Sequence, residues 1–178
     1  MPNRLIGIEF TESGAEPVTL AQVKTKLRIT DTDNDTELTA LITPCRQEVE
    51  RRANMSIVEK SIVATVDLCG AYRLPYEPVR AITEVKLITG YNTDGVVDYD
   101  TLTGDDYLMT ELYEFKSSFN GVHKITYTVG METVPADLKE IILTVIAIRY
   151  EHRGDALNEI EISKAITQLV KPYWVPCL

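Results

Sequence analysis

The stretch from Glu16 to Met55 constrains the fold most strongly, because it encodes two helices and the turn between them. Thr19 can cap the first helix, and Gln22 three residues later completes a capping box. Asn34 and Glu37 repeat this arrangement before a longer helix. Apolar side chains then recur at helical spacing, at Leu38, Leu41, Ile42, Cys45 and Val49. The pattern indicates packing and assembly and carries no catalytic chemistry.

The composition is that of an ordinary globular protein, with 178 residues, 44% hydrophobic and 25% charged. A net charge of −9 disfavours a nucleic-acid-binding surface, which needs cations to neutralise phosphates. The three cysteines are an odd number without CxxC spacing, so neither a disulfide framework nor a zinc site is expected. Cys45 lies on the apolar stripe of the second helix, and we expect a buried free thiol there.

No segment predicts a membrane span or a secretion signal. The longest apolar run, Ile141 to Ile148, is too short to cross a bilayer. The apolar stretch at the N-terminus is too short for a signal peptide. We therefore expect a soluble protein of a reducing compartment.

Beyond Met55 the sequence changes to strand patterns, with β-branched runs at about 61–68 and 82–88. A turn at Asp94-Gly95 precedes a short strand at about 96–99. The clearest strand is 122–129, where apolar and polar side chains alternate and His123 is assigned to the polar face. Further short strands are expected near residues 105–115. Residues 89–118 as a whole could form either an ordered sheet or a loop.

A third helix is expected from Pro135 to about Arg153. Proline suits a first helical turn, and Asp137 and Glu140 favour that positively polarised end. The helix is apolar on most sides, so either the sheet or a neighbouring subunit must cover it. After Gly154 one more short helix precedes Tyr173 and Trp174, which lie between two prolines. These aromatic residues could fold back onto their own core or dock on a partner.

Candidate catalytic or metal-binding patterns are weak. Asp31, Asp33 and Asp35 resemble the start of a calcium loop, but the sixth position is Thr36 and the twelfth is Ile42. An acidic helix N-terminus explains these carboxylates better.

The two histidines, His123 and His152, lie in different elements without metal-ligand spacing, and no phosphate-binding loop or nucleophile elbow is present. We therefore expect no catalytic residues, no metal site, no cofactor and no enzymatic activity.

Together the elements predict an α+β fold. An N-terminal helix pair and a C-terminal apolar helix pack around a small antiparallel β region, with an extended C-terminal tail. The expected parts are an N-terminal arm (1–16), a main domain (17–153) and a C-terminal helix and tail for partner docking (154–178). The expected helices are about 19–28, 35–54 and 135–153, and the expected strands are about 61–68, 82–88, 96–99 and 122–129.

Four segments in this order resemble the head–tail connector (adaptor) proteins of tailed bacteriophages and prophages: PVTLAQVKTKLRI, TDNDTELTALI, RLPYEPVRAITEVKLI and VHKITYTVGMETVPADLKEIILTVIAIRYEHR. The resemblance covers about residues 17–153. One departure is Pro44 inside the second helix, which removes the hydrogen bond to the Ala40 carbonyl and predicts a kink.

The resemblance implies a structural virion protein of the neck that forms a ring of about a dozen copies beneath the portal protein. This ring joins the capsid to the tail and extends the DNA channel, and a head-closure or tail protein binds it. Double-stranded DNA passes through without specific binding. The implied location is the virion neck, with the host cytoplasm during assembly.

A ring on the portal needs two sets of contact residues, of which the resemblance implies the first and the apolar helices suggest the second. The C-terminal segment would dock on the portal through Tyr173, Trp174 and Val175. The apolar helices would supply contacts between subunits through Leu38, Ile42, Val49, Ile142, Val145 and Ile146. The alternatives are a head-closure or tail-completion neck protein, a small carboxylate-dependent hydrolase and a calcium-sensing module.

Overall fold

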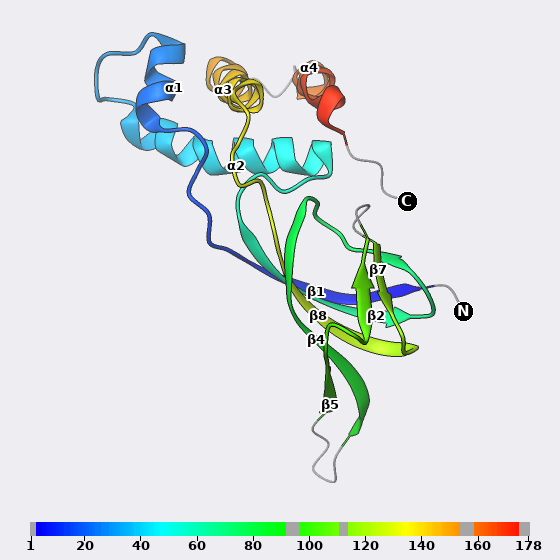
Figure 1. Ribbon diagram of the computed structural model, residues 1–178. Coiled ribbons are helices and arrows are strands. Elements are labelled where there is room, and N and C mark those ends of the chain that lie inside the picture. The colour runs from blue at the N-terminus through cyan, green and yellow to red at the C-terminus, as the bar shows by residue number, and fades with distance from the viewer. Residues whose placement is uncertain (1–2, 92–96, 111–113, 154–158, 175–178) are drawn as a thin grey trace. The chain divides into compact units, whose positions relative to one another are not determined.

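The computed structural model describes residues 3–91, 97–110, 114–153 and 159–174. They form two compact units, each assembled from separate parts of the chain (Figure 1). The sheet unit spans residues 1–14 and 58–130, and the helical unit spans residues 15–57 and 131–177.

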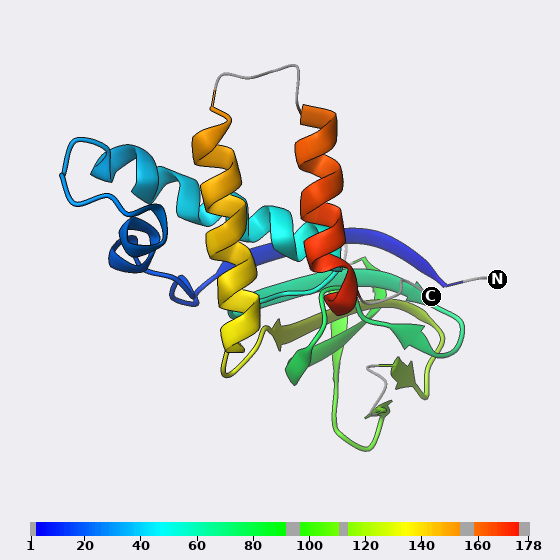
Figure 2. The same ribbon diagram turned by 90° about the horizontal axis from the view of Figure 1, so that it is seen from above.

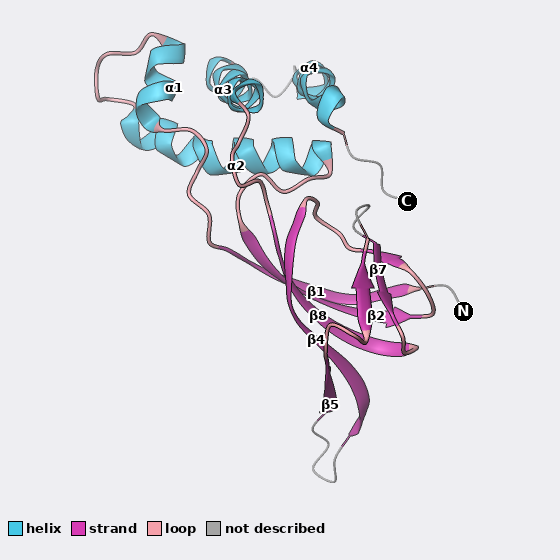
Figure 3. Ribbon diagram, in the orientation of Figure 1, coloured by secondary structure: helices cyan, strands magenta, loops and turns pink. Residues whose placement is uncertain are grey.

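The sheet unit consists of antiparallel strands, drawn in magenta in Figure 3. Its elements are β1 (Arg4–Glu12), β2 (Lys60–Leu68), β3 (Tyr72–Arg73), β4 (Val79–Tyr91), β5 (Val97–Leu102), β6 (Tyr107–Met109), β7 (Glu114–Ser117) and β8 (Gly121–Val129). Five strands form one sheet in the order β1-β2-β8-β4-β5, and three form a second in the order β3-β7-β6. Most of the described residues between 89 and 118 therefore belong to strands.

The N-terminal segment differs from the expected arm, because Arg4–Glu12 forms strand β1 at one edge of the five-stranded sheet. It pairs with β2, with an irregularity between Leu5 and Gly7. No strand is predicted here in the sequence analysis above, although Ile6, Ile8 and Phe10 alternate with Gly7, Glu9 and Thr11. Both faces of β1 are largely exposed.

The core of the sheet unit corrects the placement of His123. Along β8 the side chains of His123, Ile125, Tyr127 and Val129 are fully buried and share one face. The His123 ring bonds the Gly121 carbonyl through Nδ1 at 2.9 Å and the Ser117 hydroxyl through Nε2 at 3.0 Å. These two bonds satisfy a neutral imidazole, and burial lowers the pKa of His123. His123 is therefore a core residue and not part of the polar face.

The helical unit contains α1 (Leu20–Leu27), α2 (Asp35–Ala53), α3 (Ala136–Glu151), α4 (Glu159–Val170) and a 3-10 turn, η2 (Lys171–Tyr173). In Figures 1 and 2, α1, α3 and α4 lie in a row on one side of α2. These bounds agree with the expected helices, and the expected α+β fold is confirmed. None of the described helices is both long and apolar enough to cross a membrane.

The helix starts agree only in part with the predicted capping. The capping box is present at Thr19, whose backbone N–H donates to the Gln22 side chain at 2.8 Å. Asn34 occupies the N-cap of α2 but makes no side-chain cap bond, so the second capping box is wrong. Its ψ of 7° lies outside the extended conformation that aims an N-cap side chain at the free amides. Helix α2 continues through Pro44 to Ala53.

The helices and the sheet each have a core of their own. The helical core draws on all four helices and includes Val23, Leu38, Val49, Ile142, Val145 and Ile166. The sheet core includes Ile62, Leu74, Val85, Phe115, Ile125 and Tyr127. The apolar surface of α3 is therefore largely covered within the helical unit.

The buried histidine predicts a pH dependence of stability. Because the pKa of His123 is lowered in the folded state, the unfolded chain alone gains a proton as the pH falls through about 6.5. Stability is therefore complete above that pH and decreases below it. We expect the melting temperature to fall less between about pH 7.5 and 5.5 in His123→Gln than in the wild type. An equal fall in both proteins would contradict this assignment.

Candidate docking surface

The C-terminal helix α4 is part of the helical core and is not a loose tail. Ile162, Ile166 and Val170 recur at a spacing of four residues, and all three are buried. On the side away from this stripe, most described α4 residues are exposed. The helix therefore has a fixed buried stripe and a free face.

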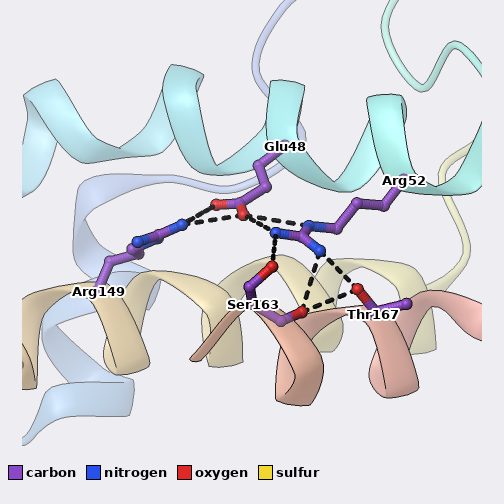
Figure 4. Close-up of polar contacts among 5 residues, drawn as sticks. All are labelled: Glu48, Arg52, Arg149, Ser163 and Thr167. Atoms are coloured by element: carbon purple, nitrogen blue, oxygen red, sulfur yellow. Dashed lines mark hydrogen bonds and ion pairs between the residues drawn. The ribbon is translucent and has the colours of Figure 1, made fainter. Parts of the chain in front are cut away.

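A polar network holds α4 to α2 and α3 (Figure 4). Arg52 on α2 donates to the Ser163 carbonyl at 3.0 Å and also bonds the Thr167 hydroxyl. The Glu48 carboxylate accepts from Arg52 at 2.6 Å and from Arg149 of α3 at 3.0 Å. One carboxylate and two guanidinium groups thus connect three helices. The i, i+4 spacing of Glu48 and Arg52 was the only signal of this network in the sequence.

The end of the described chain is anchored by Tyr173. Its hydroxyl donates to the Asp137 carboxylate in the first turn of α3, and this bond lowers the pKa of Asp137 and raises that of Tyr173. A second oxygen of Asp137 accepts from the Leu138 amide at 2.9 Å. Tyr173 therefore folds back onto its own subunit.

The next residue, Trp174, has the opposite environment. It is 56% exposed, and Leu169 in the last turn of α4 is also exposed. These are the exposed large apolar side chains of the helical unit among its described residues. Of the three residues expected to dock on a partner, Tyr173 is engaged within the chain, Trp174 faces outward, and Val175 lies outside the described residues.

The six residues expected at subunit contacts lie in the interior of the helical unit. At most 5% of each side chain is exposed for Leu38, Ile42, Val49, Ile142, Val145 and Ile146. They pack against one another and their neighbours on other helices of the same chain. A contact between subunits would have to use other, exposed side chains.

The groups considered for chemistry have structural roles. Cys45 is a buried free thiol, as expected, and burial raises its pKa to about 12. Asp35 pairs with Lys24 at 2.6 Å, and Asp33 donates its amide to the Asp31 carboxylate. Over the described ranges, no cluster of three or more His, Cys, Asp or Glu could hold a metal ion.

The fold is that of phage-like neck proteins. The chain is similar to one in a structure titled "Neck of empty GTA particle computed with C6 symmetry" (15% identity, TM-score 0.71, covering 96% of this chain and 97% of that chain). It also resembles one in "Virion of native gene transfer agent (GTA) particle" (16%, 0.70, 95% and 96%). A third match is "Neck of native GTA particle computed with C12 symmetry" (17%, 0.62, 96% and 97%).

The family follows from a sequence match. The model of the head completion protein family matches residues 16–166, and the chain belongs to this family. The expected kinship with head–tail connector proteins, and with it a structural role in the neck, is confirmed. No curated protein sequence matches the chain.

The network around Arg52 predicts how α4 is held. Arg52→Ala should remove the bonds to Ser163 and Thr167 and leave Glu48 with one partner, at a cost of about 1–3 kcal/mol in unfolding free energy. Amide hydrogen exchange should rise first in α4. The exposed neighbour Arg51 provides the control, because Arg51→Ala should change stability by less than about 0.5 kcal/mol. Equal effects of the two substitutions would contradict this role.

Proposed function

We propose that this chain forms a ring of about a dozen copies beneath the portal protein. The ring joins the capsid to the tail and extends the DNA channel. A head-closure or tail protein binds its other side. The site of action is the virion neck, reached by assembly in the host cytoplasm. The family match and the likeness to neck structures computed with C6 and C12 symmetry support this proposal.

The observation that carries the docking part of the proposal is the environment of Trp174. An exposed tryptophan is unusual on a surface that contacts only water, and tryptophan is enriched among residues that dominate binding energy. Trp174 directly follows the η2 turn, whose Tyr173 is bonded to α3, and α4 before it is held by Arg52. The side chain is thus presented from a fixed base, which reduces the entropy lost on binding.

The charge of the chain fits a channel through which DNA slides. A net charge of −9 repels phosphates and opposes tight binding to the duplex. In this proposal, double-stranded DNA therefore moves through the channel and is not a specific ligand. The family assignment favours this structural role over the hydrolase and calcium-sensor alternatives.

Removal of the residues after Tyr173 should weaken portal binding without unfolding the protein. A truncation after Tyr173 keeps Val170 in the core and the bond from Tyr173 to Asp137. We expect this truncation and Trp174→Ala to weaken binding to purified portal rings by tenfold or more, about 1.4 kcal/mol or greater. Melting temperature should stay within a few degrees of the wild-type value.

Tyr99→Ala provides a matched control, since Tyr99 is an exposed aromatic residue of the sheet unit. Portal affinity that is unchanged by the truncation would contradict the docking role of this segment. If the wild-type chain bound only a preformed ring on the portal and not the portal itself, the head-closure or tail-completion alternative would be favoured.

A further inference from the structure

A short turn separates α4 from Trp174. Val170, the last residue of α4, is buried in the helical core. Residues Lys171–Tyr173 then form η2, which contains Pro172, and the Trp174 amide donates to the Lys171 carbonyl at 3.2 Å. The proline ring fixes its own φ angle, and this removes alternative conformations of the turn. The backbone that leads to Trp174 is therefore restricted from its start in the core.

Tyr173 joins this turn to a second helix. Figure 2 shows α3 and α4 side by side and antiparallel, so the end of α4, in red, and the start of α3, in yellow, lie at the same end of the pair. The Tyr173 ring packs against the helical core, and its hydroxyl donates to the Asp137 carboxylate in the first turn of α3. The residue directly before Trp174 is thus attached by both its ring and its hydroxyl.

The acceptor of this bond is itself held in place. One oxygen of Asp137 accepts from Tyr173, and the other accepts from the Leu138 amide at 2.9 Å. The positively polarised start of a helix also favours a carboxylate. The bond from Tyr173 lowers the pKa of Asp137, so this acceptor stays ionised at neutral pH. A hydrogen bond to an ionised acceptor is stronger than a neutral one.

These contacts leave Trp174 little freedom beyond rotation of its own side chain. Its backbone is extended, with φ of −65° and ψ of 124°, and its side chain is 56% exposed. If the bond from Tyr173 to Asp137 were absent, the end of the described chain would also have to be ordered when a partner binds Trp174. Ordering a backbone costs conformational entropy and weakens binding.

We propose that Tyr173 and Asp137 are positioning residues for portal docking, because their hydrogen bond holds Trp174 in the conformation that the portal binds. Neither residue contacts the portal, and both act through Trp174. This inference rests on the proposed docking function of Trp174 and assigns part of its affinity to a bond within the chain. When that bond is lost, only a fraction of the molecules presents Trp174 correctly, and the apparent affinity falls by that fraction.

The first part of the test measures the mobility of Trp174 in the free, full-length chain. Trp174 is the only tryptophan in the sequence, so its fluorescence reports on this position alone. Tyr173→Phe removes the hydroxyl and keeps the ring, and Asp137→Ala removes the acceptor. In both variants the fast, local part of the fluorescence anisotropy decay should increase, because the indole moves more on the nanosecond timescale. The double variant should show no further increase, because each single variant already lacks the bond.

The second part measures binding of the same proteins to purified portal rings. Tyr173→Phe and Asp137→Ala should each weaken the affinity by about three- to tenfold through slower association, with the dissociation rate unchanged. In a Trp174→Ala background, Tyr173→Phe should have no further effect, because it acts only through Trp174.

Two controls separate positioning from a loss of folding. Tyr150→Phe removes a phenolic hydroxyl from α3 of the same unit and should leave both the anisotropy and the portal affinity unchanged. Asp137→Ala also removes the bond to the Leu138 amide, whereas Tyr173→Phe does not. Tyr173→Phe therefore decides the outcome if Asp137→Ala lowers the melting temperature.

Unchanged anisotropy in Tyr173→Phe would overturn the positioning role. A further loss of affinity caused by Tyr173→Phe in the Trp174→Ala background would also overturn it, because Tyr173 would then contact the portal itself. A wild-type chain that does not bind portal rings would instead overturn the proposed function. The anisotropy of the free variants would still decide whether the bond between Tyr173 and Asp137 holds Trp174 in place.

Discussion

The helical unit depends on the sharing of one carboxylate, that of Glu48, between two arginines. Arg52 lies one turn further along α2, and Arg149 lies on α3. Charge-assisted bonds of this kind are stronger than neutral ones, and guanidinium groups bind carboxylates with defined geometry. Since Arg52 also reaches Ser163 and Thr167, the position of α4 follows from that of α2. Burial of its apolar stripe stabilises the packing of α4, and the hydrogen bonds from Arg52 fix the alignment of α4 with α2.

Helix α2 uses a second arginine for a different task. Arg46 is 1% exposed and bonds Glu50 on the same helix and Glu16 in the preceding segment. Glu50 in turn accepts from the Ile57 amide at 2.7 Å, and the Ile57 carbonyl accepts from Met131 at 3.1 Å. The chain enters or leaves the helical unit close to Glu16, Ile57 and Met131. Loss of one partner from such a buried pair lowers the free energy of unfolding by about 3–5 kcal/mol. The contacts of Arg46 and Glu50 therefore hold these three segments firmly within the helical unit.

Much of the architecture could be predicted from local patterns, because helical periodicity and strand alternation reflect burial directly. The helices starting near residues 20, 35 and 136 and strand β8 are examples. His123 was misplaced although strict alternation puts it with Ile125, since its polar side chain suggested the opposite face. The pairing of Tyr173 with Asp137 joins residues 36 apart, and no local pattern encodes it.

The apolar stripes in the sequence also do not tell whether these helices pack within the chain or against a neighbouring subunit. Leu38 and Ile146 have the same pattern in either case, and only the structure shows them buried in the subunit. Exposed residues such as Trp174 and Phe10 are informative for the opposite reason, because their apolar surface is not used by the fold. The proposed portal contact therefore uses one of these side chains, that of Trp174.

The central claim is that this chain builds a ring directly on the portal, and imaging the complex with purified portal rings tests it most directly. Mixing the two proteins and examining the product by electron microscopy and light scattering would give its symmetry and mass. The account predicts a second ring on one end of the portal, with one copy of this chain for each portal subunit. Portal rings that remain bare at saturating concentrations of the chain would contradict it.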